Sequence, residues 1–151
     1  MKPWNQFSII GNLARDVSPC QTPSGTSVAR YVVAVNEVYY DKFGQRQERC
    51  DFFPVTSYGK QAENDAKYLG KGAMVAVSGS LRSWYKAEDQ RGGFEFVASG
   101  VRYLGKPQGK GEAMPDDVQA GVEPVAMPDD VEAWLADYDA YDPQQARRFG
   151  N

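Results

Sequence analysis

An all-β fold with one short helix, followed by a tail of different character, is predicted for this chain of 151 residues. Short runs rich in β-branched and aromatic residues recur as far as residue 104 and are separated by turn-forming residues. Fifteen of the nineteen aromatic residues lie in residues 1–105. That part carries thirteen basic and ten acidic residues, whereas residues 106–151 carry four and ten. The net charge of -3 therefore hides a weakly basic body and an acidic tail.

The body is predicted to contain five strands. They cover residues 4–17 (with a break at Gly11-Asn12), 27–40, 48–58, 73–84 and 94–104. The alternation of apolar and polar residues is clearest in the fourth strand, where Val75, Val77 and Leu81 share one side. Residues 41–45, with the sequence DKFGQ, are expected to form the hairpin loop that precedes the third strand.

A helix is predicted between the third and fourth strands. Ala62, Ala66 and Leu69 have the spacing i, i+4 and i+7, and glycines follow at once, so the helix should run from Lys60 to Leu69. Three strands, a helix and two strands fit a closed five-stranded Greek-key barrel of the OB type, formed by residues 1–105. Three glycines inside the strand patterns suit the bends that closure needs: Gly11, Gly79 and Gly100. An open five-stranded α+β sheet is the alternative.

The composition argues against an enzyme and against a cofactor. Without histidine, the commonest general base and metal ligand is missing. Cys20 and Cys50 lack zinc-site spacing and are expected to be free thiols in a reducing cytoplasm. The carboxylate pair Asp116/Asp117 lies in a tail without fixed geometry, so we expect no metal there. No segment resembles a secretion signal or a membrane span.

The third strand carries the clearest signal of a binding surface. Phe53 and Val55 suit the barrel interior, which leaves Phe52 and Tyr58 on the opposite, solvent-facing side. Exposed aromatic rings stack on nucleic-acid bases regardless of sequence. Basic residues around them are candidates for phosphate contacts: Lys42, Arg46, Arg49, Lys60, Lys71, Arg82 and Lys86. Alternatively, the two aromatics pack under a loop or a subunit interface, and the basic residues are ordinary solvated surface.

Five stretches of the body match a family pattern in order and spacing. They are IIGNLARD at 9–16, NEVYYDK at 36–42, FPVTSYGKQAE at 53–63, YLGKG at 68–72 and VAVSGSLR at 75–82. Over about residues 4–104 the chain thereby resembles the bacterial single-stranded DNA-binding proteins. The resemblance implies an OB-fold, usually a homotetramer, that coats single-stranded DNA in replication, recombination, repair or plasmid-type transfer. Such a protein is expected in the cytoplasm, associated with the nucleoid. The alternative is an OB-type interaction module that binds RNA or a protein.

The resemblance also implies base-stacking roles for particular aromatics. They fall on Tyr39, Phe52 and Tyr58, with a fourth at Trp84 or Tyr85. Strand alternation favours Trp84, which shares a side with Arg82. The family often has tryptophan at the first two positions, so the smaller rings here imply weaker stacking.

Residues 106–151 are predicted to form a flexible linker and a disordered acidic tail, in which the sequence AMPDDV occurs twice. Proteins of the family usually end in an acidic tip closed by a Pro-Phe pair that partners recognise, whereas this chain ends in QARRFGN. A substitute for this terminal docking motif lies upstream. The spacing of one helix face, i, i+3, i+4 and i+7, is found at Val131, Trp134, Leu135 and Tyr138. We expect a short helix at 129–138 that docks replication or repair proteins. Alternatively, the segment packs on its own barrel or never folds.

Overall fold

The computed structural model describes residues 1–88 and 90–105. It contains six strands and one helix. They are β1 (Phe7–Leu13), β2 (Ser18–Gln21), β3 (Ser27–Tyr40), β4 (Arg46–Tyr58), α1 (Lys60–Tyr68), β5 (Met74–Lys86) and β6 (Arg91–Tyr103). The predicted linker, the acidic tail and the docking helix at 129–138 lie outside the described residues.

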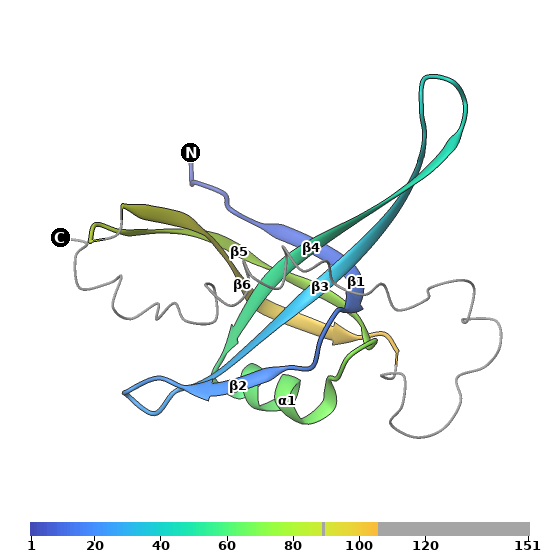
Figure 1. Cartoon of the computed structure of the whole chain (residues 1–151). Helices are drawn as coiled ribbons and strands as arrows, with labels where there is room; N and C mark the ends of the chain where they lie inside the picture. The colour runs from blue at the N-terminus through green and yellow to red at the C-terminus, as the bar shows by residue number, and fades with distance from the viewer. Residues whose placement is uncertain (89, 106–151) are drawn as a thin grey trace.

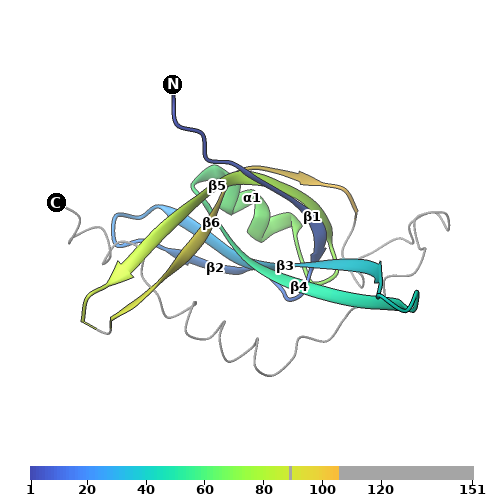
Figure 2. The same cartoon turned by 90° about the horizontal axis from the view of Figure 1, so that it is seen from above.

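Five of the strands close into a barrel (Figures 1 and 2). The sheet order is β1-β5-β6-β4-β3-β2, and β1 pairs a second time with β3, at Asn12 with Ala34 and Leu13 with Val33. Only β4 and β6 run parallel among the strand pairs described. The predicted barrel, with its helix between the third and fourth barrel strands, is confirmed, and the open-sheet alternative is wrong.

The first predicted strand was wrong in its extent. Residues 4–17 do not form one strand, because β1 begins at Phe7 and ends at Leu13. The chain then turns, and Ser18–Gln21 pairs with the start of β3 as a sixth strand that was not predicted. All four residues of β2 are exposed, and one of them is Pro19. The strand therefore lacks the alternation of apolar and polar residues that would predict it from the sequence.

The predicted hairpin loop at 41–45 is confirmed, but the following strand begins at Arg46, two residues earlier than expected. Asp41 closes the loop, because its carboxylate accepts hydrogen bonds from the backbone N–H groups of Phe43 (2.8 Å) and Gln45 (2.9 Å). These backbone hydrogen bonds lower the pKa of Asp41. Gly44 has a φ of +75°, a conformation that glycine adopts without strain.

Two of the three glycines proposed for barrel closure are required by close backbone contacts. A β-carbon at Gly79 would overlap the carbonyl oxygen of Val97, beside a register shift in the β5–β6 pair. A β-carbon at Gly11 would overlap the carbonyl oxygen of Ala34, near the point where β1 passes from β5 to β3. Both positions therefore let neighbouring strands approach closely enough to complete the ring.

A buried carboxylate joins α1 to the barrel. Asp65 has no exposed surface and accepts hydrogen bonds from Ser57 (2.6 Å), Gln61 (2.7 Å), Tyr103 (2.7 Å) and Tyr31 (3.4 Å). Burial, reinforced by the carboxylate, raises the pKa of the Tyr31 and Tyr103 phenols, so both remain donors over the physiological range. One side chain of α1 thus contacts residues of β3, β4 and β6.

We expect Asp65→Ala to lower the free energy of unfolding by about 2–4 kcal/mol, because it leaves the buried hydroxyls of Tyr31 and Ser57 without their acceptor. Urea or thermal unfolding measures this loss. Glu63→Ala, on the same helix but more exposed, is the control and should change the stability by less than about 1 kcal/mol. Equal effects of the two substitutions would show that the Asp65 network does not stabilise the fold.

Candidate nucleic-acid interface

The pairing of β3 with β4 fixes the side on which each aromatic of β4 lies. Phe53 is opposite Val33, and Val55 is opposite Tyr31, so these four share one side. Val33, Tyr31 and Val55 are fully buried in the core. The ring of Phe53 meets the ring of Phe96 edge to face, with centroids 5.6 Å apart. The predicted inward orientation of Phe53 and Val55 is confirmed.

Phe52 and Tyr58 lie on the opposite, outer side of β4, but both are half-buried. Phe52 packs against Ala14 and Val32, because the chain that leaves β1 folds back over this side. The Tyr58 hydroxyl donates a hydrogen bond to the Glu95 carboxylate (3.0 Å). We expected both rings to be fully exposed to solvent, and this was wrong in part. Each ring is partly covered by other residues, as in the alternative in which the two aromatics pack under a loop.

Beyond the barrel, β3 and β4 continue as a two-stranded arm that projects from the body (Figure 1). Tyr39 lies on this arm and is 45% exposed. The register puts Tyr39 on the side of Phe53, and hence on the opposite side of the ribbon from Phe52. Sequence reasoning missed two more exposed rings on the arm, Tyr40, which follows Tyr39 directly, and Phe43, in the loop at the tip.

The β5–β6 hairpin forms a second arm. Trp84 shares the outer side of β5 with Arg82, as predicted, but its ring lies against Gly93 of β6, and Trp84 is half-buried. Tyr85, on the other side of the strand, is 61% exposed. Phe94 shares the side of Tyr85 and is also exposed, but it was not predicted. Of the two candidates for the fourth stacking position, Trp84 and Tyr85, Tyr85 is thus the more accessible to solvent.

The predicted phosphate-binding residues fall into three groups rather than one patch. Lys42, Arg46 and Arg49 belong to the β3–β4 arm, and Arg82 and Lys86 to the β5–β6 arm. Lys60 begins α1, and Lys71 follows it. The two arms project on opposite sides of the barrel (Figure 2). The predicted phosphate-binding residues therefore lie on both arms and at the two ends of α1.

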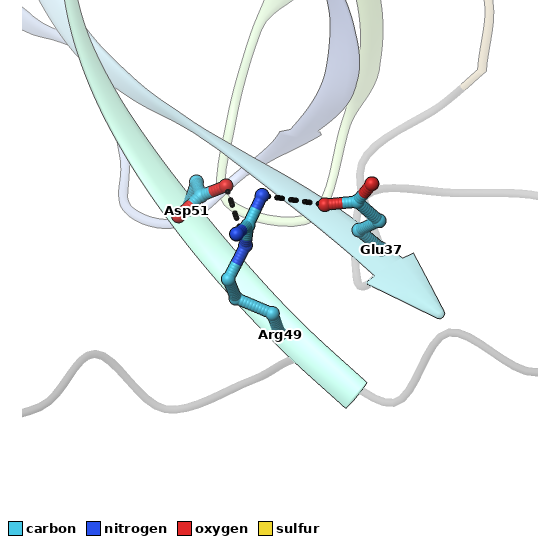
Figure 3. Close-up of polar contacts among 3 residues, drawn as sticks. All are labelled: Glu37, Arg49 and Asp51. Atoms are coloured by element: carbon cyan, nitrogen blue, oxygen red, sulfur yellow. Dashed lines mark hydrogen bonds and ion pairs between the residues drawn. The ribbon is translucent and has the colours of Figure 1, made fainter. Parts of the chain in front are cut away.

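Several of these cations already contact a carboxylate. Arg49 lies between Glu37 and Asp51, with N–O distances of 2.5 and 3.2 Å (Figure 3). Arg46 pairs with Glu48 at 2.6 Å. Lys60 pairs with Glu63 only at 3.9 Å. The Lys42 ammonium lies 5.0 Å above the Phe43 ring, a cation–π contact at the tip of the arm. Phosphate contacts by Arg46 and Arg49 would therefore require the exchange of an existing partner.

The part of the chain that the structure describes contains neither a metal-binding cluster nor a disulfide. Within residues 1–88 and 90–105, no group of three acidic or cysteine side chains is placed to hold a metal ion. Cys20 is exposed, Cys50 is half-buried, and neither forms a disulfide. Burial raises the pKa of the Cys50 thiol. The single helix of this part is too short to cross a membrane.

Comparison with known proteins identifies the relatives of this barrel. Residues 4–102 match the model of the single-strand binding protein family. A single-stranded DNA-binding protein of Aquifex aeolicus is 36% identical over 107 residues, which are 70% of this chain and 73% of that protein. One of Neisseria meningitidis serogroup A is 36% identical over 104 residues, which are 67% of this chain and 60% of that protein.

Solved structures show the same fold. The single-stranded DNA binding protein of Thermus aquaticus, as a deletion mutant, superposes with a TM-score of 0.61 at 27% identity, over 74% of this chain and 54% of that one. A Plasmodium falciparum SSB, solved in complex with ssDNA, gives a TM-score of 0.63 at 23% identity, over 69% of this chain and 97% of that one. This chain thus spans about half of the Thermus chain and less than two thirds of the Neisseria protein.

Proposed function

This chain belongs to the single-strand binding protein family, and we propose that it binds single-stranded DNA without sequence preference and without catalysing a reaction. The observation that supports this function best is the set of exposed rings on the two arms. They are Tyr39, Tyr40 and Phe43 on one arm and Tyr85 and Phe94 on the other. Rings on projecting strands offer π faces to any base. The expected setting is DNA replication, recombination, repair or plasmid-type transfer.

The half-buried aromatics extend this surface across the barrel. Phe52 and Tyr58 lie on the outer side of β4, and Trp84 lies on the outer side of β5, which β6 separates from β4. We propose that bases stack on the accessible parts of these rings, while basic residues of the arms and of the α1 ends contact phosphates. Because Tyr39 and Phe52 lie on opposite sides of the β3–β4 ribbon, a strand that contacts both must cross the edge of the ribbon.

The purified full-length chain should bind oligo-dT and mixed-sequence single strands with similar affinity and should prefer both to duplex DNA, because stacking needs unpaired bases. Raising the salt concentration should weaken binding, with a log-log slope of roughly -0.7 for each phosphate contact. Fluorescence titration measures both effects. A single-stranded RNA of equal length tests the alternative of an RNA-binding module, and equal affinity for duplex and single strand would overturn the proposed function.

Tyr85→Ala should weaken binding to oligo-dT by about 1–3 kcal/mol, the usual range for a lost stacking partner. Its ring is exposed, so thermal unfolding should hardly change. Tyr68→Ala removes a tyrosine of similar exposure on α1, away from both arms, and serves as the control that should bind normally. If Trp84→Ala weakens binding and Tyr85→Ala does not, the stacking role belongs to Trp84 instead.

We further propose that the acidic tail competes with DNA for the basic residues of the barrel. Ten acids and no base lie between residues 112 and 142. A tethered polyanion has a high local concentration, and salt screens its attraction to the barrel. Deletion of residues 112–151 should therefore tighten DNA binding, most clearly at low ionic strength. Binding that is unchanged in the truncated chain at every salt concentration would exclude the competition.

The partner-docking segment of the tail is also a proposal. Trp134→Ala with Leu135→Ala should abolish the recruitment of replication or repair proteins, whereas removal of residues 149–151 should matter little. A pull-down with the opposite pattern would assign the docking role to residues 149–151 instead.

We also propose a homo-oligomer, a tetramer as the family resemblance implies. The exposure of Trp4 (85%) and Ile10 (55%) near and along β1 supports an association surface there, and sedimentation of the full-length chain gives the number of copies.

A further inference from the structure

Arg49 is held by two carboxylates that come from different strands (Figure 3). Glu37 of β3 lies directly opposite Arg49 in the register, and Asp51 lies two residues further along β4, on the same side. The guanidinium uses Nη2 for Glu37 and Nε for Asp51. The three side chains are 54%, 58% and 43% exposed in the order Glu37, Arg49, Asp51. Ion pairs this exposed are weak and readily exchanged.

This cluster lies beside an aromatic ring that we propose to stack on a base. Tyr39 is two residues from Glu37 on the same side of the arm and pairs with Gln47, two residues from Arg49. Arg49 is therefore the diagonal cross-strand neighbour of Tyr39, a relation in which the two residues lie about 7–8 Å apart and their Cβ atoms are somewhat closer. A nucleotide stacked on Tyr39 has its phosphate within reach of the long Arg49 side chain.

The balance of charge on the β3–β4 arm shows why the carboxylates of Glu37 and Asp51 would affect DNA binding. Residues 36–51 contain three basic and four acidic residues, so the arm as a whole does not attract a polyanion. Arg46 pairs with Glu48 on the other side of the ribbon, and Lys42 lies at the tip. Beside Tyr39, on its side of the ribbon, Arg49 is thus the cation that is placed to contact a phosphate.

We infer that Glu37 and Asp51 are positioning residues that keep Arg49 as an exchangeable phosphate contact. In the bound state a phosphate displaces the two carboxylates from the guanidinium, and both carboxylates return to water with their own cations. This inference rests on the proposed binding of single-stranded DNA. The exchange lowers the affinity of the arm. It also reduces the salt dependence, because cations taken up by the carboxylates offset cations released from the phosphate.

The test compares two double variants of the full-length chain with equal charge changes. Glu37→Gln with Asp51→Asn removes the carboxylates around Arg49. Asp16→Asn with Glu63→Gln removes two acids remote from the arm, and both amides can still accept the hydrogen bonds made there by the Lys71 N–H and the Ser27 hydroxyl. This variant also releases Lys60 from Glu63, but that ion pair is long, at 3.9 Å, and highly exposed. The first variant should bind oligo-dT about three- to ten-fold more tightly than wild type, the combined effect of two exposed ion pairs. Its log-log salt slope should steepen by about 0.7. The second variant should change both quantities less, because it frees one cation from a single long ion pair, whereas the first frees Arg49 from two short ones.

A third comparison assigns the effect to the guanidinium. In an Arg49→Gln background, Glu37→Gln with Asp51→Asn should change binding no more than the remote pair does, because there is no longer a cation to release. An effect of full size in that background would overturn the inference and leave only a general charge effect. So would equal binding by the two double variants in the wild-type background. Failure of the wild-type chain to bind oligo-dT would instead overturn the proposed function.

Thermal unfolding checks that each variant is folded. If the double variant at Glu37 and Asp51 does not fold, Glu37→Gln alone, which removes the shorter of the two ion pairs, is compared with Asp16→Asn in the same way. A tightening specific to Glu37→Gln then supports the inference, and equal affinities of the two single variants oppose it.

Discussion

The strands that close this small barrel are longer than the barrel itself, and this difference in length produces the projecting arms. β3 and β4 pair without interruption from Val28 opposite Tyr58 to Tyr40 opposite Arg46. The pairing of β1 with β3 ends at Asn12 and Ala34, and beyond that point β3 and β4 have no third strand of the ring beside them. At about 3.3 Å per residue, the remaining half of the ribbon must leave the barrel. Both sides of that half face solvent, so closure itself produces the exposed arm.

The polar network at α1 gives the arms a fixed base. Asp65 contacts side chains of β3, β4 and β6, and these strands contribute to both arms. An apolar plug at this end would exclude water equally well, but it would constrain the orientation of the helix only through the shapes of the packed side chains. Hydrogen bonds to one carboxylate do have direction. The cost is a buried carboxyl group that must keep its hydrogen-bond donors.

Sequence reasoning succeeded where one side chain faces the core and its neighbour does not. The alternation at 52–58 placed Phe53 and Val55 inside because a register error would expose the whole core side. It failed at Ser18–Gln21, where backbone pairing alone makes the strand, and no side chain of the strand is buried. It also could not find the Arg49 cluster, because Glu37 is twelve residues away and becomes a neighbour only through the β3–β4 register. Strand alternation favoured Trp84 over Tyr85, because the contact of the Trp84 ring with Gly93 is again a cross-strand contact that the sequence does not reveal.

Aromatic rings and exchangeable ion pairs meet the same physical requirement of a surface that binds any sequence. Stacking energy varies little with the base, so a strand can shift along the rings at small cost. A cation held by one phosphate would resist that shift, since each step would replace a charge-assisted contact by hydrogen bonds to water alone. At Arg49 the carboxylates of Glu37 and Asp51 replace the departing phosphate, and the guanidinium is never left without a partner. Lower affinity at this arm is then the physical consequence of a contact that can be broken and remade as the strand moves.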